Sequence, residues 1–177
     1  MHLSRDAIVS TALELLTSYG LADVTMRRVA TTLGVAPGAL YWHVANKQAL
    51  IAAMATEIIS PVSGETPAEL ASSLHRELSR WRDGAEVAIA GAAFPESTTR
   101  ADLEELFAAA LEREVPEGTS ESIGVAARTL IHYVLGATFL EQSHAQLGGL
   151  SAEAHTDDAS IRATELAVSY THLTLPT

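Results

Sequence analysis

The feature that most constrains this chain is a helical periodicity that glycine and proline interrupt at short intervals. Apolar residues follow an i, i+3, i+4, i+7 pattern from Ser4 to Tyr19, and Gly20 then supplies a helix stop signal. The same pattern predicts helices over about residues 25–33, 38–44, 46–59, 66–82, 97–114 and 120–147, and a short helix or turn over 84–93. No alternation of apolar and polar residues, the sign of a strand, occurs before residue 169. The sequence therefore predicts an all-α fold.

The composition fits a globular protein with its own apolar core. Of the 177 residues, 47% are hydrophobic and none is Cys, which excludes disulfides, a CxxC redox centre and a thiolate zinc site. The longest apolar stretch, residues 123–140, is interrupted by Arg128 and His132, so we interpret it as a buried helix rather than a membrane span. The first residues show no secretory signal pattern. We therefore expect a cytoplasmic protein without a membrane partner.

The charge is distributed unevenly along the chain. The formal net charge is −11, yet residues 1–50 carry four basic side chains against three acidic ones. The rest of the chain carries seven Arg against 19 Asp and Glu. Lys47 is the single Lys of the sequence, and it follows the aromatic pair Tyr41 and Trp42 closely. The N-terminal part can thus approach a polyanion that the remainder of the chain would repel.

Two short predicted helices, over residues 25–33 and 38–44, are joined by a tight turn. Thr25 suits the N-cap of the first, Gly34 tolerates a positive φ, and Pro37 suits a first helical turn. This is the helix-turn-helix pattern, in which the second helix enters the major groove of DNA. A small three-helix bundle without a nucleic-acid function shows the same generic pattern. The residues expected to fix the angle between the helices are Leu13, Leu16, Val24, Val29, Ala30, Leu33, Val35 and Leu40.

A longer string favours the DNA-binding interpretation. Residues 40–50, Leu-Tyr-Trp-His-Val-Ala-Asn-Lys-Gln-Ala-Leu, resemble the DNA-binding domain of the tetracycline-repressor (TetR) family, whose pattern residues 4–57 follow without a gap. More weakly, Trp-Arg-Asp-Gly-Ala-Glu-Val at 81–87 and His-Tyr-Val-Leu-Gly at 132–136 resemble the regulatory core of the tetracycline-responsive subgroup. The resemblance implies an N-terminal three-helix DNA-binding domain, followed by a helical domain that dimerises and encloses a small-molecule pocket.

The resemblance also implies two sets of site residues. The DNA-binding set is Thr25, Arg27, Arg28, Pro37, Gly38, Ala39, Tyr41, Trp42, His43 and Lys47. The effector-binding set is His75, Trp81, Phe94, Phe107, Arg128, His132, Tyr133, Phe139 and Gln142. The early positions of the second motif helix carry no side-chain donors, so base reading there would rest on apolar contact with thymine methyl groups and on DNA shape. Plain core packing for the aromatic members of the second set, and a solvated helix position for His75, remain the alternatives.

The predicted pocket departs from that of the tetracycline repressors. Their magnesium-binding His falls on Ala88 here, their Glu near the end of the long helix falls on Leu140, and their effector-binding His falls near Ser63. His132 is the member of that polar set that this chain keeps. Each buried ligand group left without a partner costs about 1–3 kcal/mol. We therefore predict that magnesium-tetracycline is not the effector, and we expect no resident metal or cofactor.

Together these observations predict a transcriptional regulator, most simply a repressor that a small molecule releases from a palindromic operator. Its partners would be double-stranded DNA, an effector of unknown identity and a second copy of the chain. Residues 1–47 would bind DNA, 48–168 would bind the effector and dimerise, and 48–60 would form the linking helix. No enzymatic function is expected, because the sequence lacks a Gly-x-Ser-x-Gly elbow and a phosphate-cradling loop.

The sequence is also compatible with two other functions, and its last residues differ in pattern from the rest. A helical metal protein or enzyme would use His75, His132, Glu141 and His144, and a third possibility is a DNA-binding module without an effector. Residues 169–177 alternate and contain poor helix formers, so we interpret them as a tail foreign to the helical domain. A native frayed end is the alternative. If the final helix of the family is missing, dimerisation would be weaker than in typical relatives.

Overall fold

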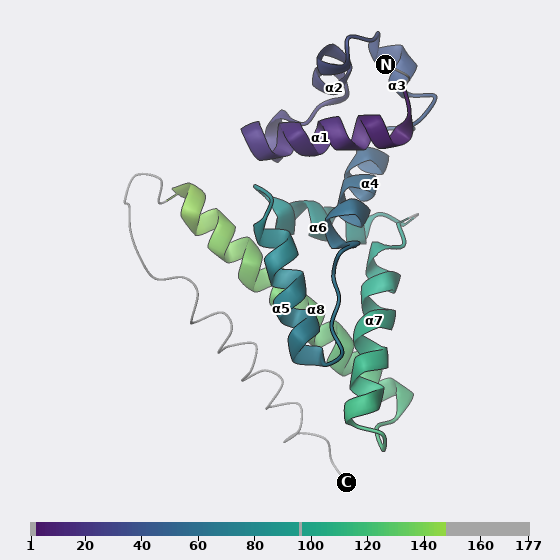
Figure 1. Ribbon diagram of the computed structural model, residues 1–177, viewed down its shortest axis with the longest axis vertical. Coiled ribbons are helices and arrows are strands. Elements are labelled where there is room, and N and C mark those ends of the chain that lie inside the picture. Colours follow the sequence, from purple (N-terminus) through teal and green to yellow (C-terminus); the bar gives the residue numbers. More distant parts are fainter. Residues whose placement is uncertain (1–2, 96, 148–177) are drawn as a thin grey trace. The chain divides into compact units, whose positions relative to one another are not determined.

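The computed structural model describes residues 3–95 and 97–147, and the secondary structure within these ranges is entirely helical (Figure 1). The all-α prediction is confirmed. The described residues form two compact units. The first unit contains the chain up to Ser60 together with Leu78–Thr99, and the second contains Pro61–Glu77 and the described residues from Arg100 onward. The helices are α1 (Arg5–Tyr19), η1 (Leu21–Asp23), α2 (Met26–Leu33), α3 (Pro37–Leu40), α4 (Lys47–Ile59), α5 (Pro67–Ser79), α6 (Gly84–Ala93), α7 (Thr99–Glu114) and α8 (Ser120–Leu147).

Local signals in the sequence set the ends of α1 and α2. The Ser4 hydroxyl accepts a hydrogen bond from the backbone N–H of Ala7, which caps the start of α1. Gly20 ends α1 with a φ of 85°, a value that glycine adopts without steric cost. The Thr25 hydroxyl caps α2 in the same way as Ser4 caps α1, and Gly34 ends α2 in the left-handed conformation. These ends agree with the sequence prediction.

The second motif helix is shorter than predicted. It was expected over residues 38–44, whereas α3 ends at Leu40 and the next three residues form a turn. The reason lies in the hydrogen bonds, because the backbone N–H groups of His43 and Val44 both donate to the Leu40 carbonyl. The chain must also become extended at Asn46, which caps α4 by accepting from the N–H of Ala49. The turn therefore replaces the second half of the predicted helix.

In the first unit, α4 and α6 pack closely against each other. A Cβ built on Gly91 of α6 would lie 2.3 Å from the Cβ of Ala55 and 3.5 Å from the Cα of Ala52, both in α4. No side chain fits in that space, so glycine allows the two helix backbones to approach. The predicted short helix or turn over 84–93 is thus a helix. The linking helix predicted over residues 48–60 belongs to the same compact unit as the DNA-binding segment, while the assignment of 48–168 to effector binding and dimerisation stays a prediction.

The second unit contains most of α5, α7 and α8. A reciprocal pair of hydrogen bonds begins α5, since the Thr66 hydroxyl accepts from the N–H of Glu69 while the Glu69 carboxylate accepts from the N–H groups of Glu65 and Thr66. These bonds favour the charged carboxylate and lower the pKa of Glu69 below its ordinary value of 4.5. The helix ends at Ser79 rather than at the predicted Arg82.

The early end of α5 has a physical cause in the segment that follows it. The N–H groups of Trp81 and Gly84 donate to the carbonyls of Leu78 and Trp81, respectively, which makes two successive turns. A Cβ on Gly84 would lie 2.2 Å from the Leu78 carbonyl oxygen, so the fold depends on glycine at this position. The chain therefore passes from the end of α5 to the start of α6 through two successive turns.

By length and composition alone, α8 could cross a membrane. Its most apolar window has a mean hydropathy of 1.4, and 39% of that window is buried within the structure. Its buried apolar residues recur at helical spacing, as expected of a core helix, and are Ile123, Ala127, Leu130, Ile131, Val134 and Leu135. The sequence-based prediction of a foreign tail over 169–177 lies outside the described residues.

Candidate nucleic-acid interface

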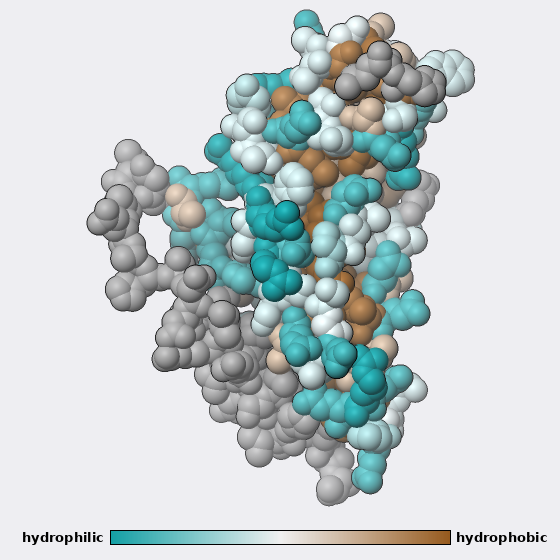
Figure 2. All heavy atoms as spheres, in the orientation of Figure 1, coloured by the Kyte–Doolittle hydropathy of each residue, from teal (hydrophilic) through white to brown (hydrophobic). Residues whose placement is uncertain are grey.

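An apolar interior holds α1, α2 and α3 together. Val29, Ala30 and Leu40 have no solvent exposure, and the α1 residue Leu16 is equally buried. Leu13 and Val24 are also buried, whereas Leu33 and Val35 are half-buried at the edge of the turn. The residues predicted to fix the angle between the two motif helices thus lie in this interior or at its margin. Figure 2 shows hydrophilic and neutral residues over this part of the chain, with hydrophobic residues visible between them.

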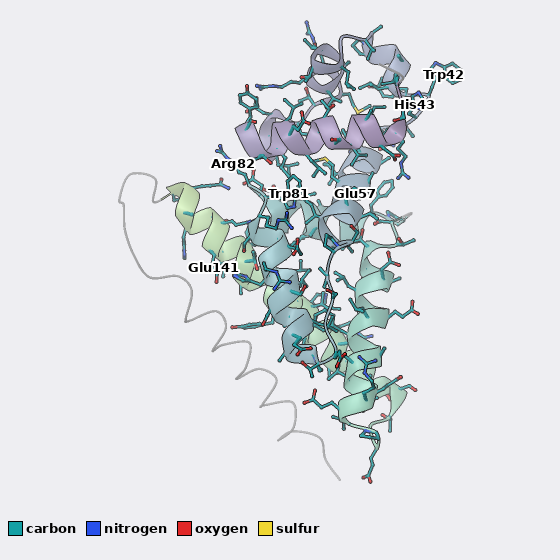
Figure 3. The ribbon with its side chains drawn as sticks, viewed as in Figure 1. Trp42, His43, Glu57, Trp81, Arg82 and Glu141 are labelled. Carbon is teal, nitrogen blue, oxygen red and sulfur yellow. The ribbon has the colours of Figure 1, made fainter. Side chains whose placement is uncertain are left out.

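The aromatic residues that follow α3 lie on the outside. Trp42 is 90% exposed, Tyr41 is 52% exposed and His43 is exposed. Figure 3 shows Trp42 projecting away from the helices of the motif. A large aromatic side chain with that exposure buries almost no apolar surface in the free chain, so folding alone does not explain its presence. Among the described residues, the turn after α3 thus leaves a large aromatic side chain open to solvent.

The start of α3 presents backbone and small apolar groups. Pro37 and Gly38 are exposed, and Ala39 is half-buried. None of the three offers a side-chain hydrogen bond, as the sequence indicated. Contact with base edges from these positions is therefore limited to apolar surfaces such as the thymine methyl group.

The other polar and cationic members of the predicted set lie in the caps and helices on either side of α3 in the chain. Thr25 and Arg27 are exposed, and Lys47 and Arg28 are half-buried. Lys47 and Arg27 add two accessible positive charges to this part of the first unit, and cations of this kind bind phosphates without reading the base sequence. The ten predicted DNA-binding residues are thus all accessible, and their roles remain predictions.

Arg28 differs from its neighbour Arg27 in having fixed partners within the chain. Its Nη1 atom forms an ion pair with Oδ1 of Asp23, at the end of η1. Its guanidinium carbon lies 3.9 Å from the centre of the Tyr19 ring, a cation–π contact with the last turn of α1. Sequence reasoning counted Asp23 as one of three acidic residues in the region and did not pair it. The five-residue spacing between Asp23 and Arg28, across the start of α2, was the available signal.

A second residue missed by sequence reasoning is Asp83, which connects α6 to the DNA-binding helices. Its buried Oδ2 atom accepts a hydrogen bond of 2.7 Å from the backbone N–H of Leu21, 62 residues earlier. Asp83 adopts a left-handed conformation with a φ of 57°, which non-glycine residues rarely do. A Cβ at Gly20 would lie 2.8 Å from the same oxygen, so the approach requires glycine there. We call this contact between Asp83 and the residues 20–21 the Asp83 clasp.

The predicted effector residues do not share one environment. In the first unit, Trp81 and Phe94 are half-buried. In the second unit Phe107 is completely buried, while Arg128, His132 and Phe139 are exposed and His75, Tyr133 and Gln142 are half-buried. A cavity of about 50 Å³ in the first unit is lined by Arg5, Asp6, Val9, Ala53, Thr56 and Glu57, none of which belongs to the predicted set. Pockets for drug-sized ligands measure about 300–1,000 Å³, so this cavity is not an effector pocket.

A polar cluster in the second unit joins α5 and α8. Nδ1 of His75 lies 3.0 Å from the Thr138 hydroxyl and 3.7 Å from Oε2 of Glu141. His75 is therefore not the freely solvated position that the alternative reading assumed. Within residues 3–95 and 97–147, no group of three or more His, Asp or Glu side chains is placed to hold a metal ion. Two of the four residues proposed for a metal protein, His75 and Glu141, thus lie close together, but the described residues around them do not form a metal site.

Comparisons with known proteins agree with this geometry. A sequence model described as bacterial regulatory proteins, tetR family, matches residues 8–54. The class D tetracycline repressor protein of Escherichia coli is 34% identical over 157 residues, which is 81% of this chain and 68% of the repressor. A crystal structure of BioQ with its natural double-stranded DNA operator superposes with a TM-score of 0.82 at 32% identity, over 96% of this chain and 98% of that one. A variant of TetR from Acinetobacter baumannii AYE in complex with minocycline gives a TM-score of 0.78 at 26% identity, over 99% and 98% of the two chains.

Proposed function

Because this chain belongs to the tetR family of bacterial regulatory proteins, we propose that it is a transcriptional repressor that a small molecule releases from a palindromic DNA operator. The observation that carries the proposal is the exposed aromatic turn after α3, above all Trp42, which is 90% exposed on a helix-turn-helix scaffold. Resemblance to BioQ, whose structure was solved with its DNA operator, supports the same function. The chain would act in the cytoplasm by binding and not by catalysis.

In the proposed complex, α3 lies in the major groove and the cations flank it. Lys47 and Arg27 would contact phosphates, which position the motif without reading sequence. Tyr41 and Trp42 would pack against the groove wall and the sugar-phosphate backbone. Since Pro37 at the start of α3 has no donor, the operator preference would come from thymine methyl contacts and from DNA deformability. We therefore expect a modest specificity per base pair at these positions.

A homodimer would place two such motifs on one operator. The two recognition helices of a symmetric dimer must be about 34–36 Å apart to enter successive major grooves on one face of DNA. The helix α8 leaves Val125, Leu140 and Leu147 exposed, at 51%, 57% and 78% respectively. Apolar side chains of this size on one helix favour burial against a second copy. Light scattering of the purified chain measures the mass of the assembly directly, and a monomer would contradict this part of the proposal.

Contacts within the first unit would transmit a conformational change caused by the effector to the DNA-binding helices. The Asp83 clasp and the contact of Gly91 with Ala55 attach α6 to the DNA-binding helices and to α4, so a displacement of α6 must be transmitted to them or break these contacts. An effector shifts the balance between DNA-bound and released states only by its different affinity for the two. We propose that the effector favours a position of α6 in which the two motifs of the dimer no longer match the groove spacing.

Magnesium-tetracycline is not the effector that we propose. The family position of the magnesium-binding His is Ala88, which is 1% exposed and offers no ligand atom to a metal. Minocycline is bound in the structure of the A. baumannii TetR variant, but a drug held through a metal would lack this partner here. A fluorescence titration with tetracycline and Mg²⁺ should show no tight metal-dependent binding. Tight binding that EDTA abolishes would overturn this prediction.

The experiment that tests the proposed function is a selection from a library of random DNA duplexes with the purified chain. We expect enrichment of a palindromic sequence whose half-sites are about one helical turn apart. Footprinting on the recovered duplex should protect two successive major grooves on one face. Enrichment of no sequence, or of a single half-site without symmetry, would contradict the proposal. A screen for small molecules that release the recovered duplex would then separate an effector-controlled repressor from a DNA-binding module without an effector.

A further inference from the structure

We propose that Asp23 is a built-in competitor for the DNA phosphate at Arg28, so that one acidic side chain of this chain lowers its own affinity for DNA. The inference rests on the proposed DNA-binding function and adds a residue to it. Asp23 belongs neither to the predicted DNA-binding set nor to the hydrophobic interior. It is a negatively charged residue on the surface that we expect to face a polyanion, which requires an explanation.

The geometry holds the Arg28 guanidinium from two sides. Asp23 forms the ion pair with Nη1, and the Tyr19 ring lies 3.9 Å from the guanidinium carbon. The main chain of Arg28 is fixed as well, because its N–H donates to the Thr25 hydroxyl that caps α2. Two contacts, from α1 and η1, thus hold the guanidinium, and the cap of α2 fixes the backbone that carries it. The side chain is arranged before any DNA arrives.

The pair is nevertheless open to an approaching phosphate. The side chains of Arg28 and Asp23 are 35% and 48% exposed, respectively. Carboxylates and phosphates accept hydrogen bonds from the same guanidinium donors with similar geometry. A phosphate at Arg28 must therefore either displace the Asp23 carboxylate or bind beside it, where the two anions repel each other. Either route reduces the net gain from the contact.

Arg27 provides the internal comparison. It lies in the same first turn of α2 and is exposed, and within the described residues it forms no salt bridge. A phosphate that binds Arg27 contacts a positive charge without a neutralising partner among these residues. A phosphate that binds Arg28 contacts a positive charge that Asp23 already neutralises. Two adjacent arginines of equal charge should therefore contribute unequally to DNA affinity and to its salt dependence. Removal of the Asp23 charge should make the contributions of Arg27 and Arg28 to DNA affinity more similar.

The test measures the affinity of Asp23→Asn for two DNA duplexes by fluorescence anisotropy at several salt concentrations. One duplex is the sequence recovered by selection, and the other has the same length and a mixed sequence. Asparagine keeps the side-chain size and can still accept a hydrogen bond from Arg28, so the change removes the charge and little else. Glu14→Gln is the matched control, since Glu14 is an exposed acidic residue of α1 in the same unit.

Asp23→Asn should bind both duplexes about three- to tenfold more tightly at low salt, because phosphate contacts carry no sequence information. The slope of log affinity against log salt should become steeper by about 0.9, the value for one additional neutralised phosphate. Glu14→Gln should change the affinity by less than about twofold, because among the described residues Glu14 forms no ion pair with an arginine of the motif. Equal thermal unfolding of the three proteins would exclude a folding effect.

A double-mutant cycle locates the effect at Arg28. Arg28→Gln should reduce the affinity more in the Asp23→Asn background than in the wild type, because the arginine is neutralised only in the latter. Weaker or unchanged binding by Asp23→Asn, or an equal gain for Glu14→Gln, would overturn the inference while leaving the proposed function intact. Absence of duplex binding by the wild type would overturn the proposed function and this inference with it.

Discussion

The two compact units of the molecule differ in where their predicted functional side chains lie. In the first unit the predicted DNA-binding residues are all accessible, over an interior of residues such as Val29 and Leu40 without any exposure. In the second unit the predicted effector residues range from Phe107, which is completely buried, to the exposed His132. The predicted DNA-binding residues are thus distinct from the buried interior of the first unit, whereas the predicted effector residues of the second unit include both buried and exposed positions.

This difference shows how the two kinds of site are encoded. A surface that docks into a DNA groove needs side chains that point outward from a rigid scaffold, and short sequence signals specify both. A small-molecule site needs side chains that converge, and convergence depends on packing between helices distant in sequence. Residue type alone cannot distinguish a ligand contact from a core residue there.

The largest effect on stability is expected at the contact between α4 and α6. Gly91→Ala would place a Cβ 2.3 Å from that of Ala55, which should lower the free energy of unfolding by about 3 kcal/mol, at the upper end for an overpacked site. Gly136→Ala in α8 is the matched control, because nothing lies within 4 Å of its Cβ and the helix should gain up to about 1 kcal/mol. Urea unfolding of both variants measures the contrast. Adding Ala55→Gly to Gly91→Ala should recover part of the loss, and failure to do so would contradict the contact.

The Asp83 clasp should give the next largest effect. Asp83→Ala leaves the buried N–H of Leu21 without its acceptor, which should cost about 2 kcal/mol of unfolding free energy. Asp83→Asn keeps a side-chain oxygen and tolerates the left-handed backbone, so it should cost less than about 1 kcal/mol. Urea unfolding distinguishes the two variants. Equal stability of wild type and Asp83→Ala would show that the clasp does not hold α6 to the DNA-binding helices.

A smaller effect is expected at the turn between α2 and α3. Gly34 has a φ of 68°, and its Cβ position is open, so Gly34→Ala pays a backbone penalty of about 1 kcal/mol without a clash. Gly38→Ala is the control, because Gly38 has equally open space within α3 and no positive φ. Thermal unfolding should rank Gly34→Ala below both wild type and Gly38→Ala. Identical melting of the two variants would mean that the turn conformation is not required.

The smallest effect concerns the start of α5 in the second unit and depends on pH. The hydrogen bonds from the N–H groups of Glu65 and Thr66 lower the pKa of Glu69, so its carboxylate stabilises the fold fully above the ordinary pKa of 4.5. This contribution is lost as the pH falls through the lowered pKa of the folded state. The difference in stability between wild type and Glu69→Gln should therefore shrink in acid, as measured by urea unfolding at several pH values. Glu112→Gln, exposed in α7, controls for the loss of charge, and a difference that grows in acid would contradict the capping role.

The sequence predicted best those structural features that depend on residues close together in the chain. Thr25 and Gly34 mark the two ends of α2 because their effects act within a single helical turn. The end of α3 at Leu40 was missed, because it depends on a turn in which the N–H groups of His43 and Val44 share the Leu40 carbonyl. The Asp83 clasp joins residues 62 positions apart, and no periodicity reports such a contact. The all-helical class and the accessible DNA-binding set could be predicted from the sequence. Which of the predicted effector residues are buried and which are exposed could be determined only from the folded structure.

The central claim is that the segment from Thr25 to Lys47 holds DNA through the residues it exposes. The most direct test is the affinity of Tyr41→Ala, Lys47→Ala and their combination for the selected duplex, with Arg100→Ala in α7 as a control that removes a cation of the second unit. We expect about a tenfold loss for each single variant and about a hundredfold loss for the double variant, since a charge-assisted hydrogen bond is worth about 1.5–3 kcal/mol. Unchanged affinity of the double variant, or an equal loss for Arg100→Ala, would contradict the claim.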